Sequence, residues 1–408
     1  MRSLVMFRLA YRNVLLNWRH SLATILAICL GYAAVSLFDG FMAHMKGFIV
    51  ESYVSRGMLG HVVVQKTGAR AKIHDDVWQA TLDESEQERI TSILREDPRI
   101  ATFSRFLSLT GVASLGNGKQ AVFIGIGHDL DKGRAMRGEK WVWNTIAGRP
   151  LNVGDKSEVL VGMGLARRFN CDFDTKGAVT SEGTYLPTER RLGCPRSSMQ
   201  LSVTTEHLQV NALELKPVGV IDMLIREYND RFIMLPLATA QALSDSKRIN
   251  HFSVLMKDPD HQYAFAEDLR TRLKTAGVDA EVVNWLDYAA AAPAKGGLEI
   301  LAIFRTLFLT VIGVISAMSV ANSMMKSINE RIREIGTLRS FGFRRGDILL
   351  MLIAEGFLLG AFSCALGLVL TVVVAALISS AGLHFNTGIM SDTTPLKVSQ
   401  SMISWLVL

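Results

Sequence analysis

The stretch "INERIREIGTLRSFGFRRGDI", residues Ile328 to Ile348, carries the charges of a soluble surface helix, yet it lies between two long apolar segments. Its large apolar side chains recur at helical spacing: Ile328, Ile332, Ile335, Leu338 and Phe341. We therefore expect a two-faced helix, with one face on apolar material and the charged face available to another molecule. Gly342 and the basic residues after it predict the end of that helix.

The composition predicts a mixed protein, part membrane and part aqueous domain. The 408 residues are 49% hydrophobic and 20% charged, and the mean hydropathy is +0.24. The hydrophobic fraction and the mean hydropathy are high for a soluble protein, whereas the charged fraction is too high for a bundle made only of membrane helices. The net charge of +6 does not indicate nucleic-acid binding, because the basic residues cluster beside the apolar segments and not among aromatic ones.

Three segments are long and apolar enough to span a bilayer, which needs about 20 residues. They are residues 21–38, 298–325 and 348–382. A fourth span begins at residues 401–408, and we expect it to be truncated in the sequence given. The fold class expected is therefore a membrane α-helical protein with four spans.

The basic residues predict the orientation of these spans. They gather in residues 1–20, before the first span, and in residues 326–347, between the second and third. Both groups belong in the cytoplasm by the positive-inside rule. Residues 1–20 are expected to form a cytoplasmic interfacial helix before an uncleaved anchor, and residues 326–347 a cytoplasmic coupling helix. Residues 39–297 then form a large periplasmic domain with a stalk, and residues 383–400 a short periplasmic loop.

Charged side chains within or beside the spans are expected to be paired, because an unpaired charge in a bilayer costs at least about 2.5 kcal/mol. Glu355 lies in the third span, near its inner end. Arg305 lies toward the outer end of the second span, at a depth where it could approach Asp39.

An apolar stripe continues past the first span at helical spacing: Phe38, Phe41, Met42, Met45 and Phe48. Two interpretations remain open at this point. The stripe either packs on the second span, or its Met and Phe side chains form an adaptable wall that faces an apolar substrate.

The region outside the membrane reads as an α+β domain. Its segments alternate without the regular order of a doubly wound sheet. Strands are predicted at "GHVVVQK", "LKPVGVID", "DRFIMLPL" and "NHFSVLMK", helices at "DESEQERITSILREDP" and "QYAFAEDLRTRLKTAG", and a hairpin at "FSRFLSLTGVASLGNGKQAVFIGIG".

Of the four cysteines, Cys29 and Cys364 lie in spans, whereas Cys171 and Cys194 flank a polar, irregular segment outside. An oxidising compartment and a segment with few apolar residues predict a disulfide between Cys171 and Cys194, worth about 3 kcal/mol by chain entropy. Two free thiols are the alternative.

The sequence lacks the motifs of several catalytic classes. It has no phosphate loop, no G-x-S-x-G elbow, and no H-E-x-x-H among its nine histidines. We therefore expect that the chain is not an enzyme and binds no cofactor or metal.

"NERIREIGTLRSFGFRRGDILLMLIAEGFLLG" resembles the signature of the FtsX-like permease domain, in which R-x-R-E-I-G-x-L-R-x-x-G precedes a span that bears a Glu and glycines. The matching positions are Arg331, Arg333, Glu334, Ile335, Gly336, Leu338, Arg339, Gly342, Glu355, Gly360 and Gly367. "FRLAYRNVLLNWRHSLATILAICLG" and the strands outside also resemble MacB-like permeases, and the pattern is most similar to the lipoprotein-releasing LolC/LolE type.

The resemblance implies a mechanotransmitting permease subunit of an ABC transporter in the bacterial inner membrane. A separate ATPase subunit, holding ATP and Mg, would grip the coupling segment at Arg331, Arg333, Glu334, Gly336, Arg339, Gly342, Arg344 and Arg345. Further partners implied are a second permease and a periplasmic acceptor or adaptor. The substrate would be a lipid-anchored or amphiphilic molecule such as a lipoprotein. A permease of a tripartite efflux system for a drug, peptide or siderophore, and an FtsX-like signalling module that controls an envelope hydrolase, remain alternatives.

Overall fold

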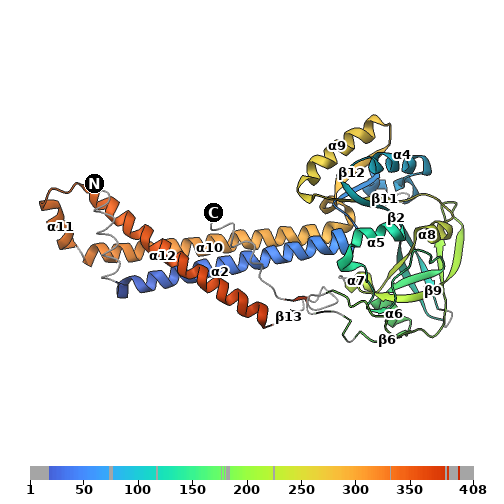
Figure 1. Ribbon diagram of the computed structural model, residues 1–408, viewed down its shortest axis with the longest axis horizontal. Coiled ribbons are helices and arrows are strands. Elements are labelled where there is room, and N and C mark those ends of the chain that lie inside the picture. Colours follow the sequence, from blue (N-terminus) through green and yellow to red (C-terminus); the bar gives the residue numbers. More distant parts are fainter. Residues whose placement is uncertain are drawn as a thin grey trace. The chain divides into compact units, whose positions relative to one another are not determined.

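The structure is a computed structural model, and it describes residues 18–72, 77–115, 118–175, 177–178, 180, 184–223, 226–330, 332–381, 384–385 and 394–395. The chain forms two compact units (Figure 1). The helical unit contains the long helices before Gly47 and from Gly297 onward. The sheet unit is Gly47–Gly296, with the short paired strands β13 (His384–Phe385) and β14 (Thr394–Pro395). The predicted combination of apolar helices with a large α+β unit is confirmed.

The described residues of the helical unit lie mainly in four helices: α2 (Trp18–Glu51), α10 (Ala292–Glu330), α11 (Ile332–Ser340) and α12 (Arg345–Ser380). Among the described residues, three helices are long and apolar enough to cross a membrane. These are α2, which contains the predicted span 21–38, α10, which contains the predicted span 298–325, and α12, which covers residues 348–380 of the predicted span 348–382. Residues 1–17 of the predicted helix 1–20 lie outside the described residues. The predicted start of a fourth span, residues 401–408, also lies outside them.

The coupling segment, predicted over residues 326–347, falls on three helices of the structure. Residues 326–330 are the end of α10, Ile332–Ser340 form α11, and residues 345–347 begin α12, whereas Arg331, between α10 and α11, lies outside the described residues. Gly342 has φ +88°, a conformation that suits glycine, and it ends this turn before α12 begins.

The sheet unit contains one mixed sheet of ten strands, in the order β12-β1-β11-β2-β3-β10-β5-β9-β4, with β8 paired to β2 and β9. Most neighbours are antiparallel, but β10 runs parallel to β3, and β5 runs parallel to β9. The strands are β1 (Val62–Lys66), β2 (Ile100–Ser114), β3 (Gln120–His128), β4 (Ala147–Gly148), β5 (Glu158–Gly162), β8 (Met199–Thr204), β9 (Val210–Ile221), β10 (Phe232–Pro236), β11 (His251–Met256) and β12 (Ala280–Asn284).

Short helices cover this sheet, and two strands form a separate small pair. The helices are α3 (Ala69–Lys72), α4 (Glu84–Arg95), α5 (Leu130–Arg137), α6 (Met163–Arg168), α7 (Arg226–Asn229), α8 (Leu237–Ser244) and α9 (Gln262–Thr275). The small pair joins β6 (Asp172–Phe173) to β7 (Leu192–Gly193). The predicted strands and helices quoted above are confirmed, whereas β8 and β12 were not predicted.

Local sequence explains the main elements of the sheet unit. The first three residues of β1 are fully buried valines because both faces of this strand are covered: Val62 and Val64 belong to the main core, and Val63 belongs to a second apolar cluster on the other face. Asp83 accepts a hydrogen bond from the Glu86 amide, and the Glu86 side chain accepts one from the Asp83 amide, so a capping box starts α4. The side chains of Phe123, Phe252 and Phe265 are fully buried in the core.

A buried carboxylate connects the end of α4 to α9. The Asp97 side chain is 2% exposed, and its Oδ2 lies 2.6 Å from Arg99 Nη2 and 2.6 Å from Arg272 Nη1. The hydrogen bonds from Arg99 lower the pKa of Asp97 from 3.8 to about 2, against the effect of burial. Because the folded-state pKa is depressed, this carboxylate stabilises the fold above about pH 4, and that contribution is lost as the pH falls toward 2.

We predict that Asp97→Asn lowers the free energy of unfolding at pH 7 by about 1–2 kcal/mol, a value reduced for the partial exposure of both arginines. The wild-type protein should lose this difference between pH 4 and pH 2, whereas the variant should not. Chemical denaturation followed by circular dichroism at pH 7 and pH 3 measures both. Asp131→Asn, at an exposed carboxylate, is the control, and equal pH slopes for Asp97→Asn and wild type would contradict the prediction.

Candidate functional site

The charged surface of α11 is the first candidate site. Arg333, Glu334 and Arg339 are exposed, and within the described part of the chain none of them forms an ion pair. The apolar face is divided, because Ile335 is half-buried while Ile332 is 64% exposed. The helix therefore presents both charged and apolar groups that intramolecular contacts leave uncovered.

The remaining residues of the predicted coupling site surround α11. Gly336 is exposed on the helix, and Arg344 and Arg345 are exposed at the start of α12, where the Arg344 amide donates to Asp347 Oδ2 at 2.9 Å. Arg331 lies outside the described residues. The predicted coupling residues that the structure describes therefore lie in α11, in the turn after it and at the start of α12.

An ion pair joins α2 to α10. Arg305 Nε lies 2.7 Å from Asp39 Oδ1, and the Asp39 side chain is only 10% exposed. One residue earlier on α2, the ring of Phe38 stacks on Phe308, with centroids 4.9 Å apart and planes 9° apart. Figure 1 shows α2 and α10 running side by side. The sequence predicts, from depth in the membrane alone, that Arg305 could approach Asp39, and the structure contains this ion pair.

The stalk residues divide between packing and partial exposure. Phe38 packs on Phe308, and Met45 is buried at 7% exposure. Phe41, Met42 and Phe48 are half-buried. The packing interpretation of this stripe therefore describes Phe38 and Met45, and a substrate-facing role remains a proposal for the other three residues.

The third long helix packs through a regular seam. Its buried residues recur every four positions: Met351, Glu355, Leu359, Ser363, Gly367, Thr371 and Ala375. A Cβ at Gly367 would lie 3.0 Å from the Cys29 backbone oxygen and 2.8 Å from Tyr32 Cδ1, so α2 and α12 approach closely there. Small residues at such a seam allow close helix packing in membranes. Glu355 lies on this buried face at 5% exposure.

Beyond α2, within the sheet unit, the chain forms a single turn of π-helix, η1 (Ser52–Arg56), and the Gly57 amide donates to Ser52 O at 2.9 Å. Such turns are rare and occur often at functional sites. Met58 then has φ +56°, which is strained for a bulky residue, and Gly60 has φ +67°. A Cβ at Gly60 would lie 2.4 Å from Val254 O, so the chain requires glycine there.

Trp141, in the short helix η3 (Glu139–Trp141), holds both ends of this turn. Its indole Nε1 donates to Glu51 Oε1 at 2.9 Å, and the guanidinium carbon of Arg56 lies 5.1 Å from its ring centre. Lys140 Nζ also lies 2.5 Å from Glu51 Oε1. We call the residues Glu51, Arg56 and Trp141 the joint. The sequence does not predict the joint, because no local pattern links Trp141 to a turn ninety residues away.

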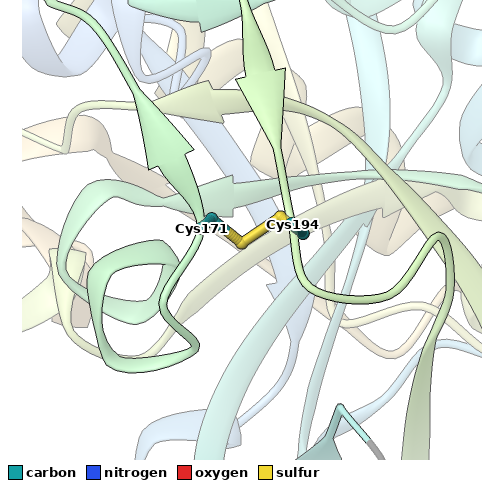
Figure 2. The surroundings of a disulfide bond; sticks show 2 residues. All are labelled: Cys171 and Cys194. Carbon is teal, nitrogen blue, oxygen red and sulfur yellow. A yellow bond between two sulfur atoms is a disulfide. The ribbon is translucent and has the colours of Figure 1, made fainter.

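Cys171 and Cys194 form a disulfide, which Figure 2 shows, and Cys29 and Cys364 are free thiols. The bridge joins the ends of the polar segment beside the small β6–β7 pair. The pairing and the two unpaired cysteines correspond to the arrangement expected from the sequence.

Two buried histidines lie in the sheet unit. His251 stacks on Phe106 at a centroid distance of 5.0 Å, and its Nδ1 lies 3.0 Å from the Tyr288 hydroxyl. Burial lowers the pKa of His251 and of His128 to about 3, so both rings are neutral at physiological pH. Within the described residues no three His, Cys, Asp or Glu side chains are grouped as metal ligands would be.

Comparison of the sequence with known families identifies two domains. The MacB-like periplasmic core domain matches residues 21–272, and the FtsX-like permease C-terminal domain matches residues 306–408. The first match alone covers more than half of the chain.

The chain belongs to the MacB-like periplasmic core domain family.

Individual relatives are more distant. An uncharacterized ABC transporter permease of Methanocaldococcus jannaschii is 24% identical over 174 residues, which cover 42% of this chain and 44% of the relative. The macrolide export ATP-binding/permease protein MacB of Brucella abortus is 30% identical over 161 residues, 38% of this chain and 24% of that protein. The match thus spans less than half the length of either relative.

Solved structures show a weak likeness. The periplasmic region of MacB from Actinobacillus actinomycetemcomitans gives a TM-score of 0.36 at 13% identity, covering 59% of this chain and 92% of that one. The extracellular domain of the transporter YknZ from Gram-positive bacteria gives 0.35 at 10% identity, covering 55% and 100%. The family assignment therefore rests on the sequence.

In this member of the MacB-like family, we predict that Arg305→Gln lowers stability by about 1–3 kcal/mol, because it leaves the Asp39 carboxylate without its cation in apolar surroundings. Thermal unfolding in detergent micelles measures the effect, with Arg345→Gln as the exposed control. Exchanging the charges, with Asp39→Arg and Arg305→Asp together, should recover part of the loss. Additive losses in the exchanged variant would show that the pair does not contribute.

The α12 seam gives a second prediction, with a matched control on the same helix. Gly367→Val should lower the unfolding temperature by an amount that corresponds to about 1–3 kcal/mol, because the added atoms meet backbone and ring atoms of α2. Gly360→Val should change it little, since a Cβ at Gly360 meets nothing within 4 Å. Equal effects of the two substitutions would contradict close packing at Gly367.

Proposed function

We propose that this chain is the permease subunit of an ABC transporter of the MacB and FtsX type, and that it transmits movement from a separate ATPase. The observation that carries the proposal is α11, a short helix whose charged side chains form no ion pair among the described residues and which lies, along the chain, between two helices of membrane-spanning length. The FtsX-like match over residues 306–408 contains this helix. The 408 residues contain no phosphate-loop motif, so we place ATP and Mg on the partner.

We propose a bacterial inner-membrane location, with the N-terminus and α11 in the cytoplasm and the sheet unit in the periplasm. The basic residues of segments 1–20 and 326–347 support this orientation by the positive-inside rule. A fourth span, beginning at residues 401–408, would return the chain to the cytoplasm. Large apolar side chains are exposed along α10, as expected of a surface that faces lipid or a second permease: Ile303, Phe304, Leu307, Val311, Ile315 and Met318.

The proposed mechanism begins at α11. The ATPase would bind Arg333, Glu334 and Arg339, and its closure on ATP would move α10 and α12, which flank that helix in the chain. The pair Asp39–Arg305 ties α10 to α2, so α2 would follow the movement. Through the joint at its end, α2 would then move the sheet unit.

The substrate we propose is a lipid-anchored or amphiphilic molecule, such as a lipoprotein, that leaves the membrane for a periplasmic acceptor. The half-buried Phe41, Met42 and Phe48 supply the apolar surface that such a substrate needs. Mass spectrometry of molecules that copurify with the complex in lipid nanodiscs distinguishes an acylated protein from a small amphiphile. A neighbouring gene for a membrane-fusion adaptor would favour tripartite efflux, and one for an envelope hydrolase would favour the signalling alternative.

We predict that Glu334→Ala with Arg339→Ala weakens binding of the ATPase by roughly ten-fold or more, since truncating central interface residues costs more than 1 kcal/mol each. Copurification and ATPase activity in nanodiscs measure assembly and stimulation. Glu267→Ala with Arg270→Ala, an exposed pair on α9, is the matched control. Unchanged assembly and ATPase stimulation would exclude α11 as the coupling site.

A further inference from the structure

Arg56, the last residue of η1, lies close to two aromatic rings. Its guanidinium carbon lies 5.1 Å from the centre of the Trp141 ring and 4.9 Å from that of Tyr185. Its Nη2 donates to the Tyr185 hydroxyl and, at 2.8 Å, to the backbone oxygen of Asp222. A planar guanidinium that contacts two rings and bonds to two acceptors has few orientations open to it. Arg56 therefore fixes where the chain leaves α2.

Tyr185 belongs to the segment that the Cys171–Cys194 disulfide closes (Figure 2). Its side chain is buried at 6% exposure, and its ring meets Trp141 edge-on at 6.2 Å. The two rings and Arg56 thus contact one another. Arg56 and Trp141 belong to the joint, and Tyr185 is an additional residue that contacts both.

The segment is fastened to the sheet unit at points on both sides of Tyr185. The disulfide holds its two ends, and the Gly148 amide donates to the Arg190 backbone oxygen at 2.9 Å. Ala178, within the segment, is fully buried, and its oxygen accepts from the Leu186 amide at 2.9 Å. These contacts leave Tyr185 little freedom to withdraw from Arg56.

We propose that Tyr185 is a positioning residue for Arg56, and that the disulfide-closed segment is a clamp that keeps the last turn of α2 fixed to the sheet. With the clamp closed, movement of α2 reaches the sheet. Without Tyr185 or the disulfide, the turn at Glu51–Arg56 becomes mobile and the movement is lost there. This inference rests on the proposed function only for the source of the movement, because the clamp is a property of the chain alone.

The test is a distance measurement between spin labels on the full chain in nanodiscs. Labels at Gly47→Cys, on the last turns of α2, and Lys274→Cys, on α9, both occupy exposed positions, and a Cβ at Gly47 meets nothing within 4 Å. Cys29 and Cys364 are replaced by alanine so that only the introduced thiols react. Circular dichroism of each variant shows whether the sheet unit is still folded.

We expect Tyr185→Ala and the double variant Cys171→Ser with Cys194→Ser to broaden the distance distribution by roughly two-fold or more, and Tyr185→Phe to broaden it less, because the ring remains. Tyr263→Ala, at a 65% exposed tyrosine on α9, is the matched control and should leave it unchanged. A distribution of wild-type width for Tyr185→Ala in a folded protein would overturn the proposal.

A second comparison separates positioning from general stabilisation. If Tyr185 acts through Arg56, Tyr185→Ala should add no broadening to a chain that already carries Arg56→Ala. Equal broadening in both backgrounds would show that Tyr185 stabilises its own segment and would overturn the positioning role.

The same labels test transmission in the complex with the ATPase. Because the clamp should move the end of α2 and the sheet together, trapping nucleotide should leave the distance unchanged in wild type, whereas in Tyr185→Ala it should shift or broaden while ATP hydrolysis continues. An unchanged distance in the variant would overturn the clamp. Failure of the wild type to assemble with any ATPase would reject the proposed function. The widths of the distance distributions measured on the isolated chain would still show whether the clamp exists.

Discussion

A carboxylate among apolar helices needs a cation, and the structure supplies one through the pair of Asp39 with Arg305. The long helices of the helical unit depend on that constraint. Because the charges must meet, α2 and α10 share one register at this level, which also brings Phe38 onto Phe308. Apolar side chains alone would allow the two helices to slide or rotate, since lipid contacts satisfy them equally well. The ion pair therefore selects one arrangement of helices from several of similar free energy.

The same helix connects that pair to the sheet unit. After Asp39, α2 continues without interruption to Glu51, whose carboxylate accepts a hydrogen bond from Trp141, and the guanidinium carbon of Arg56, in the π-helical turn that follows, lies 5.1 Å from the centre of the same indole ring. Under the proposed function, this is the route by which a shift of α2 would reach the joint.

Much of this arrangement could be predicted from the sequence. The length of the apolar segments predicts the three long helices, and period-two patterns predict strands such as β1. The depth of Asp39 and Arg305 in the predicted spans indicates that the two residues could meet. The joint could not be predicted, because Glu51 and Trp141 meet only through the tertiary fold and neither lies in a recognisable motif. The role of Phe38 was left open for a similar reason, since a stripe on one helix does not say which neighbour covers it. The short strand β12 was missed because its sequence, AEVVN, has only two adjacent valines beside polar residues, whereas β1, of the same length, begins with three valines.

The proposed transmission of movement is tested most directly by hydrogen exchange at the backbone amides of residues 51–60, in the complex with the proposed ATPase and with or without trapped nucleotide. Movement carried by α2 predicts that exchange in this turn changes when nucleotide is trapped, and that the change disappears when the Asp39–Arg305 pair is broken. Exchange that stays the same throughout the sheet unit while the complex hydrolyses ATP would contradict the role of this chain as a transmitter.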